Sequence, residues 1–227
     1  PRKFGPAVDL ARCRRGLPGR LRLCRAAGVD VVFCPADAAM YPGRDAGRYS
    51  TYVVEEALGR GLEGGARPTH FRGVTTIVAK LFNLVLPDVA VFGAKGWQQG
   101  AGIPRMTAEL NFPVRIVVAP TVRERDGLAL SSRNRYLTPA QRTQAAVLSR
   151  ALRLARAEVR RWAAGVPAAR LRALVAAEVE ARPGARLEYV EFFTGRTLAP
   201  VDPVRRGAHA ALAARVGTTR LIDNLAL

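Results

Sequence analysis

The sequence predicts an α/β fold with a mainly parallel sheet in its first half. Short apolar runs indicate strands at residues 29–34, 49–54, 88–93 and 114–118, the second being the weakest. Helical patterns cover residues 71–86 and 97–111, so helices and strands alternate along this part of the chain. Such alternation favours parallel strands with helices on both faces of the sheet.

Helical periodicity and prolines delimit the elements of the first half. Apolar side chains recur at helical spacing through residues 71–86 and form one face of the expected helix, which Pro87 ends. A shorter helix is expected at 20–27. Pro104 falls inside the helix expected at 97–111, where the lost hydrogen bond costs ~3 kcal/mol or more unless a kink is accommodated.

A different pattern begins after residue 120 and predicts a smaller α+β domain. Thr138 is followed by Pro139 and Gln141, the arrangement of an N-cap with a capping box, so a long helix is expected to about residue 164. A second helix and two strands are then expected at residues 168–181, 187–193 and 208–216. We therefore expect two domains, residues 1–121 and 122–227, with the boundary near Thr121.

The net charge of +18 is the unusual feature of the composition. Only Lys3, Lys80 and Lys95 are lysines, so 33 of the 36 basic residues are arginines. An excess of this size suggests a polyanion such as nucleic acid. The arginines are spread along the whole chain, however, and aromatic residues make up only 7%. A general compositional bias therefore explains the charge better, with an arginine-rich polyanion binder as an alternative.

The cysteines and the apolar runs bear on the cellular compartment. Cys13, Cys24 and Cys34 have the spacing of neither a disulfide framework nor a zinc site. Cys34 ends an apolar run and is expected to be a small buried side chain. No apolar run approaches the ~20 residues of a membrane helix. These observations favour the reducing cytoplasm.

Two segments of the first half carry chemical groups that suit an anion. Residues 67–73 place Arg67 and His70 at a helix N-terminus, which favours negative charge, although a solvated loop with a capping histidine fits equally well. Residues 92–99 follow a strand whose carboxyl end is where α/β sheets bind ligands. There Lys95 supplies a charge and Gln99 an amide, which favours a phosphate or carboxylate ligand, although this is not the Walker sequence.

A third such segment, residues 126–134, lies at the expected domain junction. Ser131 and Ser132 offer hydroxyls, and the Arg133 guanidinium can bind two oxygens at once, which suits a polyphosphate. The alternative is a turn with a helix cap, but Thr138 already caps the next helix.

Taken in order, these segments resemble the pantoate–beta-alanine ligase family, also called pantothenate synthetase. The resemblance covers nearly the whole chain and rests on residues 67–74, 80–83, 87–88, 92–95, 98–99, 126–137 and 213–224. It implies a Rossmann-like nucleotidyl-transferase domain followed by a small α+β domain, in a cytoplasmic homodimer. It also implies that ATP, with Mg²⁺, adenylates pantoate and that beta-alanine then displaces AMP.

The resemblance also implies roles for particular residues. The ATP site would be lined by Gly93, Ala94, Lys95, Gly96, Val122, Leu130, Ser131, Ser132 and Arg133. Gln99 would hold pantoate, with Arg67 and His70 as an anion-contacting pair nearby. Lys3 stands where the family has a glutamine that contacts both pantoate and beta-alanine. No metal-ligating residue is assigned.

The match departs from the family in one segment that matters for catalysis. The family's His-x-Gly-His motif, which grips the ATP phosphates and carries the catalytic acid, does not occur in these 227 residues. Residues 1–5 match a family loop that normally follows it, so we expect the first part of the Rossmann-like domain to be missing. Gly96 also replaces an aspartate. We assign no catalytic residue and expect residual ATP binding without appreciable adenylation. The alternatives are an impaired remnant that only dimerises or binds nucleotide, and the polyanion binder.

Overall fold

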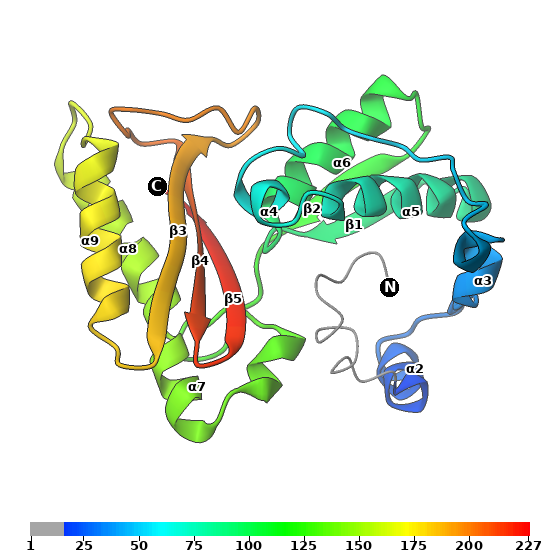
Figure 1. The fold of residues 1–227 in the computed structure, drawn as a ribbon, viewed down its shortest axis with the longest axis horizontal. Helices are drawn as coiled ribbons and strands as arrows, with labels where there is room; N and C mark the ends of the chain where they lie inside the picture. Colours follow the sequence, from blue (N-terminus) through cyan, green and yellow to red (C-terminus); the bar gives the residue numbers. More distant parts are fainter. Residues whose placement is uncertain (1–15) are drawn as a thin grey trace.

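The computed structural model describes residues 16–227 and arranges them around two separate sheets (Figure 1). A parallel pair of strands belongs to the first half, and three antiparallel strands belong to the second. The mixed α/β class is therefore confirmed, with a parallel sheet followed by a small antiparallel sheet. The expectations for Lys3 and Cys13 lie outside the described residues.

The parallel sheet is built as the sequence predicts. Strand β1 (Val89–Gly93) pairs with β2 (Arg115–Ala119) in parallel, with Val89 opposite Arg115. Helices α5 (His70–Val85) and α6 (Trp97–Glu109) pack against it, and α6 continues through Pro104. Their apolar side chains form a small core of Val74, Val78, Ala79, Phe82, Ile103 and Met106, against which Phe92, Phe112 and Ile116 pack.

The prediction that helices cover both faces of this sheet is wrong for the described residues. Ala90 and Phe92 point toward α5 and α6, but Val91 between them is 65% exposed. Successive side chains of a strand point to opposite faces, so two helices packed on one face leave the other face uncovered.

Two predicted strands are absent from the first half. Residues 29–34 and 49–54 are irregular, and the first run is exposed, with Val31 at 81% and Cys34 also exposed rather than buried. A strand needs a hydrogen-bonded neighbour, and none of the described residues supplies one at 29–34. The Val53 backbone bonds instead to hydroxyls of α5: Thr75 donates to its carbonyl (2.6 Å), and its amide donates to Thr76 (3.1 Å).

Short helices surround these irregular segments. They are α2 (Leu17–Ala26), α3 (Asp37–Met40), the 3₁₀ turn η1 (Arg44–Ala46) and α4 (Leu62–Ala66). The first confirms the predicted helix at 20–27, with its start three residues earlier. Helix α4 was not predicted, and it matters because it contributes to the site described below.

The second half contains the predicted helices and one additional strand. Its elements are η2 (Ser132–Tyr136), α7 (Pro139–Ala145), α8 (Val147–Arg161), α9 (Ala168–Glu180), β3 (Ala185–Thr194), β4 (Ala208–Val216) and β5 (Thr219–Ala226). The capping box at Thr138 is confirmed. The prediction of a single long helix is wrong, because the helical segment divides into α7 and α8 at Ala146. Strand β5, which pairs antiparallel with β4, was not predicted.

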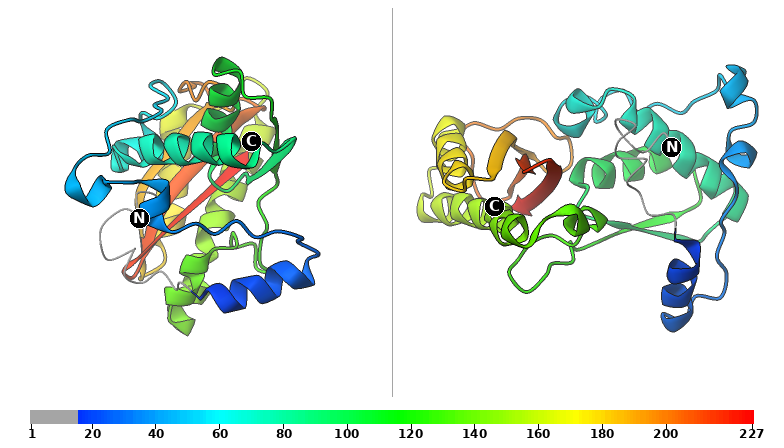
Figure 2. Two further views of the ribbon diagram at one scale, coloured as in Figure 1. Left: turned by 90° about the vertical axis from the view of Figure 1, so that its right-hand side faces the viewer. Right: turned by 60° about the horizontal axis from the view of Figure 1, so that its bottom comes forward.

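Helices α8 and α9 cover one face of the antiparallel sheet, and the opposite face is turned toward the first half (Figure 2). In β4, Ala210, Leu212 and Ala214 belong to a large core with Leu148, Leu171 and Val175 of the two helices. His209 and Ala211 alternate with them and are buried too. The central strand is therefore covered on both faces.

Residues 120–131 connect β2, the last strand of the parallel sheet, to η2, the first element of the second half. We propose, on this ground, that the domain boundary lies near Thr121 and separates residues 1–121 from 122–227. None of the helices that the structure describes is both long and apolar enough to cross a bilayer.

Candidate functional site

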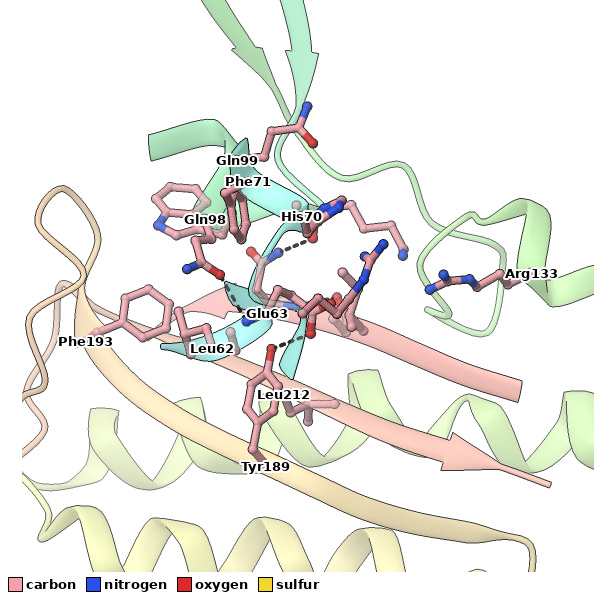
Figure 3. A pocket seen from close by; sticks show the side chains of 18 residues that line it. Leu62, Glu63, His70, Phe71, Gln98, Gln99, Arg133, Tyr189, Phe193 and Leu212 are labelled. Atoms are coloured by element: carbon pink, nitrogen blue, oxygen red, sulfur yellow. Dashed lines mark hydrogen bonds between the residues drawn. The ribbon is translucent and has the colours of Figure 1, made fainter. Parts of the chain in front are cut away.

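A cavity of about 110 Å³ lies between the two halves, on the side of the antiparallel sheet away from α8 and α9 (Figure 3). From the first half and its connection it is lined by Leu62, Glu63, Arg67, His70, Phe71, residues 95–99 and Arg133. Its lining from the antiparallel sheet consists of Tyr189, Phe193, Ala211, Leu212 and residues 222–224. In Figure 3, Arg133 reaches in from the side opposite Phe193 and Leu62, so the cavity has a basic end and an apolar end.

The structure brings six of the predicted site residues together around this cavity: Arg67, His70, Lys95, Gly96, Gln99 and Arg133. Lys95 and Gly96 form the turn after β1, and Gln99 stands in the first turn of α6. His70 begins α5. The site therefore occupies the carboxyl end of the parallel strands, where α/β sheets bind ligands.

The other predicted residues lie beside the cavity. Leu130, Ser131 and Ser132 line an adjoining open groove of about 440 Å³ together with Glu124, Asn134, Arg135 and Arg142. Ser131 also caps η2, because its hydroxyl accepts from the Arg133 amide (3.2 Å). The helix-cap alternative thus applies to this serine.

Gly93, Ala94 and Val122 line neither hollow but stand at the same strand ends. The Ala94 amide donates to the Ala119 carbonyl (2.8 Å), which extends the parallel pairing. The Leu130 amide donates to the Val122 carbonyl (2.8 Å), and both apolar side chains are more than half exposed. A side chain at Gly93 would meet nothing within 4 Å. Val122 and Leu130 therefore form an exposed apolar surface at the groove that Leu130 lines.

A buried ion pair joins α4 to the antiparallel sheet at the cavity wall. The Glu63 carboxylate accepts two hydrogen bonds from Arg220 of β5 (2.7 and 2.8 Å) and one from the Tyr189 hydroxyl of β3 (3.0 Å). Burial alone would raise the pKa of Glu63, but these bonds and the Arg220 charge outweigh it and lower the pKa. Burial, followed by the charge of Glu63, raises the pKa of Tyr189.

A second buried carboxylate, Asp223, is paired in the same way. Arg123 donates to both of its oxygens (2.7 and 2.9 Å), and only 1% of the Asp223 side chain is exposed. With Glu63 and Asp223 both neutralised by arginines outside the lining, the remaining charged lining side chains are Arg67, Lys95 and Arg133, all of them positive. The cavity therefore suits an anionic ligand.

Lys95 carries its charge in a partly buried position at the cavity. Burial lowers the pKa of its ammonium, the Arg133 charge adds to this, and the Asp223 carboxylate opposes it. None of the described residues places a carboxylate oxygen within 4 Å of the ammonium in a salt bridge. A phosphate or carboxylate ligand would supply the missing negative charge.

Two residues at the start of α6 fix the cavity wall: Gln98 binds the segment around α4 within the first half, and Trp97 contacts the second half. The Gln98 side chain is buried; it donates to the carbonyls of Leu58 (2.7 Å) and Arg60 (2.9 Å) and accepts from the Glu63 amide (3.0 Å). The Trp97 indole stacks on His209, with ring centroids 3.6 Å apart, and donates to the Gly195 carbonyl (3.0 Å). Even a Cβ on Gly195 would lie 3.2 Å from the indole, so this position favours glycine.

Several residues of the site were not found from the sequence. Glu63 and Tyr189 were not singled out, and Arg220, Asp223 and Asn224 were noted only within the C-terminal motif. No local signal could have paired Glu63 with Arg220, which lies 157 residues away. A charged residue inside an otherwise apolar strand, as at Arg220 and Asp223, is the only available clue.

Comparisons with known proteins show the family of this chain. The family model described as pantoate-beta-alanine ligase matches residues 1–226. The chain is 50% identical to the pantothenate synthetase of Moorella thermoacetica, covering 100% of this chain and 78% of that protein. It is 51% identical to the one from Anaeromyxobacter dehalogenans, covering 99% and 75% respectively.

Solved structures share the fold over the whole chain. The crystal structure of pantothenate synthetase from Thermus thermophilus has a TM-score of 0.89 and 44% identity, covering 100% of this chain and 80% of that one. A pantoate-beta-alanine ligase from Francisella tularensis, in complex with beta-gamma ATP and beta-alanine, has a TM-score of 0.75 and 26% identity, covering 100% and 76%.

Proposed function

Because this chain belongs to the pantoate-beta-alanine ligase family, we propose that it is an AMP-forming ligase that joins pantoate to beta-alanine through a pantoyl-adenylate. ATP-dependent ligation of these two substrates is the reaction of the family. The observation that carries the proposal is the convergence of Arg67, Lys95 and Arg133 on one cavity at the carboxyl end of β1. AMP and pyrophosphate are the proposed by-products.

ATP is proposed to bind across the basic end of the cavity. Lys95 and Arg133 would contact the phosphates, with the hydroxyls of Ser131 and Ser132 along the adjoining groove. The exposed side chains of Val122 and Leu130 offer an apolar surface for the adenine ring. Gly93, which carries no side chain, would leave room for the nucleoside next to Ala94, and Gly96 lines the cavity beside Lys95. The 110 Å³ of the cavity cannot hold a nucleotide alone, so the groove is a necessary part of this site.

Pantoate is proposed to occupy the inner part of the cavity. Gln99 would bind it through its amide, while Arg67 and His70 would hold its carboxylate or that of beta-alanine. Its two methyl groups would face the ring of Phe71. Lys3, a proposed substrate contact outside the described residues, would add a further positive charge.

The proposed chemistry needs positive charge where negative charge accumulates. The pantoate carboxylate attacks the ATP α-phosphorus and pyrophosphate leaves, so a buried ammonium at Lys95 stabilises the crowded phosphates. The beta-alanine amine then attacks the acyl carbon of the mixed anhydride, forms the amide bond and releases AMP. This second step depends mainly on holding the amine close to the carbonyl.

Magnesium is proposed to enter with ATP and not to occupy a protein site built from the described residues. No group of three or more His, Cys, Asp or Glu side chains within residues 16–227 could hold a metal ion. Both cavity carboxylates are already paired with arginines. Phosphate oxygens and water are ligands that Mg²⁺ prefers.

The test is pyrophosphate release and pantothenate formation with saturating pantoate, beta-alanine and ATP. Lys95→Met is expected to lower the rate ~10²–10³-fold, because it removes a charged donor from the phosphates. Lys80→Met is the matched control. Lys80 belongs to α5, its ammonium lies over the Tyr49 ring, and it does not line the cavity. A chain extended with the family's His-x-Gly-His segment is expected to react ~10²–10³-fold faster than the 227 residues alone.

Three results would contradict the proposal. Equal rates for Lys95→Met and Lys80→Met would show that Lys95 does not bind the phosphates. ATP binding without any pantothenate from either chain would indicate a nucleotide-binding remnant, and DNA binding with a steep salt dependence would favour the polyanion binder. A homodimer and a cytoplasmic location are proposed from the family resemblance, and sedimentation tests the first.

A further inference from the structure

We propose that Asn224 is a positioning residue for the ligase reaction: its carboxamide, reaching from β5, sets the place of the Lys95 ammonium in the cavity. The inference rests on the proposed function of Lys95. It assigns a role to the C-terminal motif that the reaction itself leaves without one.

The contact is direct and bridges the two halves. The Asn224 side-chain nitrogen donates to two consecutive carbonyls, those of Ala94 and Lys95, each at 2.9 Å. Asn224 is 6% exposed and Ala94 is 9% exposed. Because one side-chain nitrogen binds both carbonyls, it fixes the backbone turn from which the Lys95 side chain extends. Loss of this donor would leave buried carbonyls without a hydrogen bond, which is destabilising.

Asn224 is itself held rigidly. Its amide donates to the Asp223 carboxylate (2.8 Å), and its carbonyl accepts from Arg123 (3.2 Å). Its partner across the β4–β5 ladder is Ala211. Arg123 follows β2, whereas Lys95 follows β1, so the loops at the carboxyl ends of both parallel strands are bound by the Asp223–Asn224 pair.

The same pair bears on the charge of Lys95. Burial disfavours the ammonium, and the Asp223 carboxylate is the largest of the effects that oppose this. Without the Asn224 bonds the turn is free to move, water reaches the ammonium, and its distance from the phosphates is no longer fixed. A displacement of this kind slows a reaction without abolishing substrate binding.

The first test observes Lys95 without substrates. The chain has only three lysines, so a protein labelled with ¹³C and ¹⁵N in lysine side chains gives three ammonium signals, and Lys95→Arg assigns the relevant one. In Asn224→Ala the pKa of Lys95 is expected to rise toward the ordinary lysine value. The Lys80 signal is the internal control. Gln144→Ala is the matched variant, because it also loses a carboxamide-to-backbone bond, outside the cavity: the Gln144 side-chain oxygen accepts from the Gly184 amide (2.8 Å).

The second test is a double-mutant cycle on pyrophosphate release. In the wild-type background, Asn224→Ala is expected to lower kcat about 10- to 100-fold. In the Lys95→Met background the same substitution is expected to lower kcat less than about twofold, because two substitutions that act through the same residue are not additive. Gln144→Ala is expected to leave kcat within about twofold in both backgrounds. A structural role alone would give the same fold-change in both backgrounds.

The outcomes separate this inference from the proposed function. An unchanged Lys95 titration in Asn224→Ala, or an equal loss of rate in both backgrounds, overturns the positioning role. If the wild-type chain releases no pyrophosphate, the proposed function fails, and the lysine titration still decides whether Asn224 controls Lys95. Should Asn224→Ala not fold, Asn224→Ser is used, because one short hydroxyl cannot bond to both carbonyls.

Discussion

The parallel and antiparallel halves of the molecule differ in how much core they bury. The core of the antiparallel half joins α8, α9 and the sheet, with Leu148, Leu171, Leu212 and Val175 fully buried. The core of the parallel half is six side chains between α5, α6 and one face of β1 and β2. Exposed apolar side chains, among them Val31, are concentrated in the first half.

The difference matters because most of the candidate site belongs to the more weakly packed half. Arg67, His70, Lys95 and Gln99 all come from it. Contacts with the antiparallel sheet hold this half in place: Arg220 binds Glu63, Asn224 binds the Lys95 turn, and His209 stacks on Trp97. The well-packed half therefore acts as the frame on which the site is assembled.

Substitution of two phenylalanines from predicted strands is the strongest test of the difference in core packing between the two halves. Phe192 is 1% exposed in β3, whereas Phe33 is 51% exposed in an irregular segment. Phe192→Ala is expected to lower the free energy of unfolding by about 3–5 kcal/mol, and Phe33→Ala by less than about 0.5 kcal/mol. Denaturant unfolding measures both. Equal losses would mean that residues 29–34 belong to a core after all.

The contact between the halves is tested by Glu63→Gln. Arg220 would lose its buried partner, and we expect the free energy of unfolding to fall by about 3 kcal/mol at pH 7. Glu188→Gln is the control, because Glu188 also bonds to Arg220 but is more exposed, at 26% against 12%.

The pH dependence of the same variant follows from the lowered pKa of Glu63. The folded state holds Glu63 ionised below its ordinary pKa of 4.5, so its stabilisation is complete above that value and is lost as the pH falls through the folded value. The difference between wild type and Glu63→Gln is therefore expected to shrink below about pH 4.5. A difference independent of pH would show that packing, not charge, is what the substitution removes.

The protonation of His209 is expected to give the smallest and most specific change in the free energy of unfolding. Burial lowers its pKa to about 4, against an ordinary value of 6.5. The unfolded chain therefore binds the proton more readily, and stability falls as the pH drops from 6.5 toward 4. At pH 5 this amounts to about 2 kcal/mol relative to pH 7.5.

His209→Phe is the variant that isolates this effect, since it keeps a ring against Trp97 and removes the titration. Its unfolding free energy is expected to change less than that of the wild type between pH 7.5 and pH 5. Parallel pH profiles for the two proteins would show that His209 is solvated enough to protonate in the folded state.

Regular elements were predicted well where the local pattern was sufficient. The amphipathic face of α5, the proline after it and the capping box at Thr138 each depend on neighbouring residues, and each is observed. Three cationic residues singled out from the family motifs, Arg67, Lys95 and Arg133, line one cavity, and their roles remain predictions. The strands at 29–34 and 49–54 were wrong because apolar composition alone does not provide a pairing partner.

The sequence by itself therefore determined the mixed α/β class, most of the longer helices and the chemical character of the site, since these depend on residue type and local spacing. Only the tertiary structure decided which strands find partners, and that Glu63 meets Arg220 or Asn224 meets Lys95. These pairs join residues more than a hundred positions apart. Such contacts depend on how two separately folded sheets pack against each other, and no local pattern of residues encodes that arrangement.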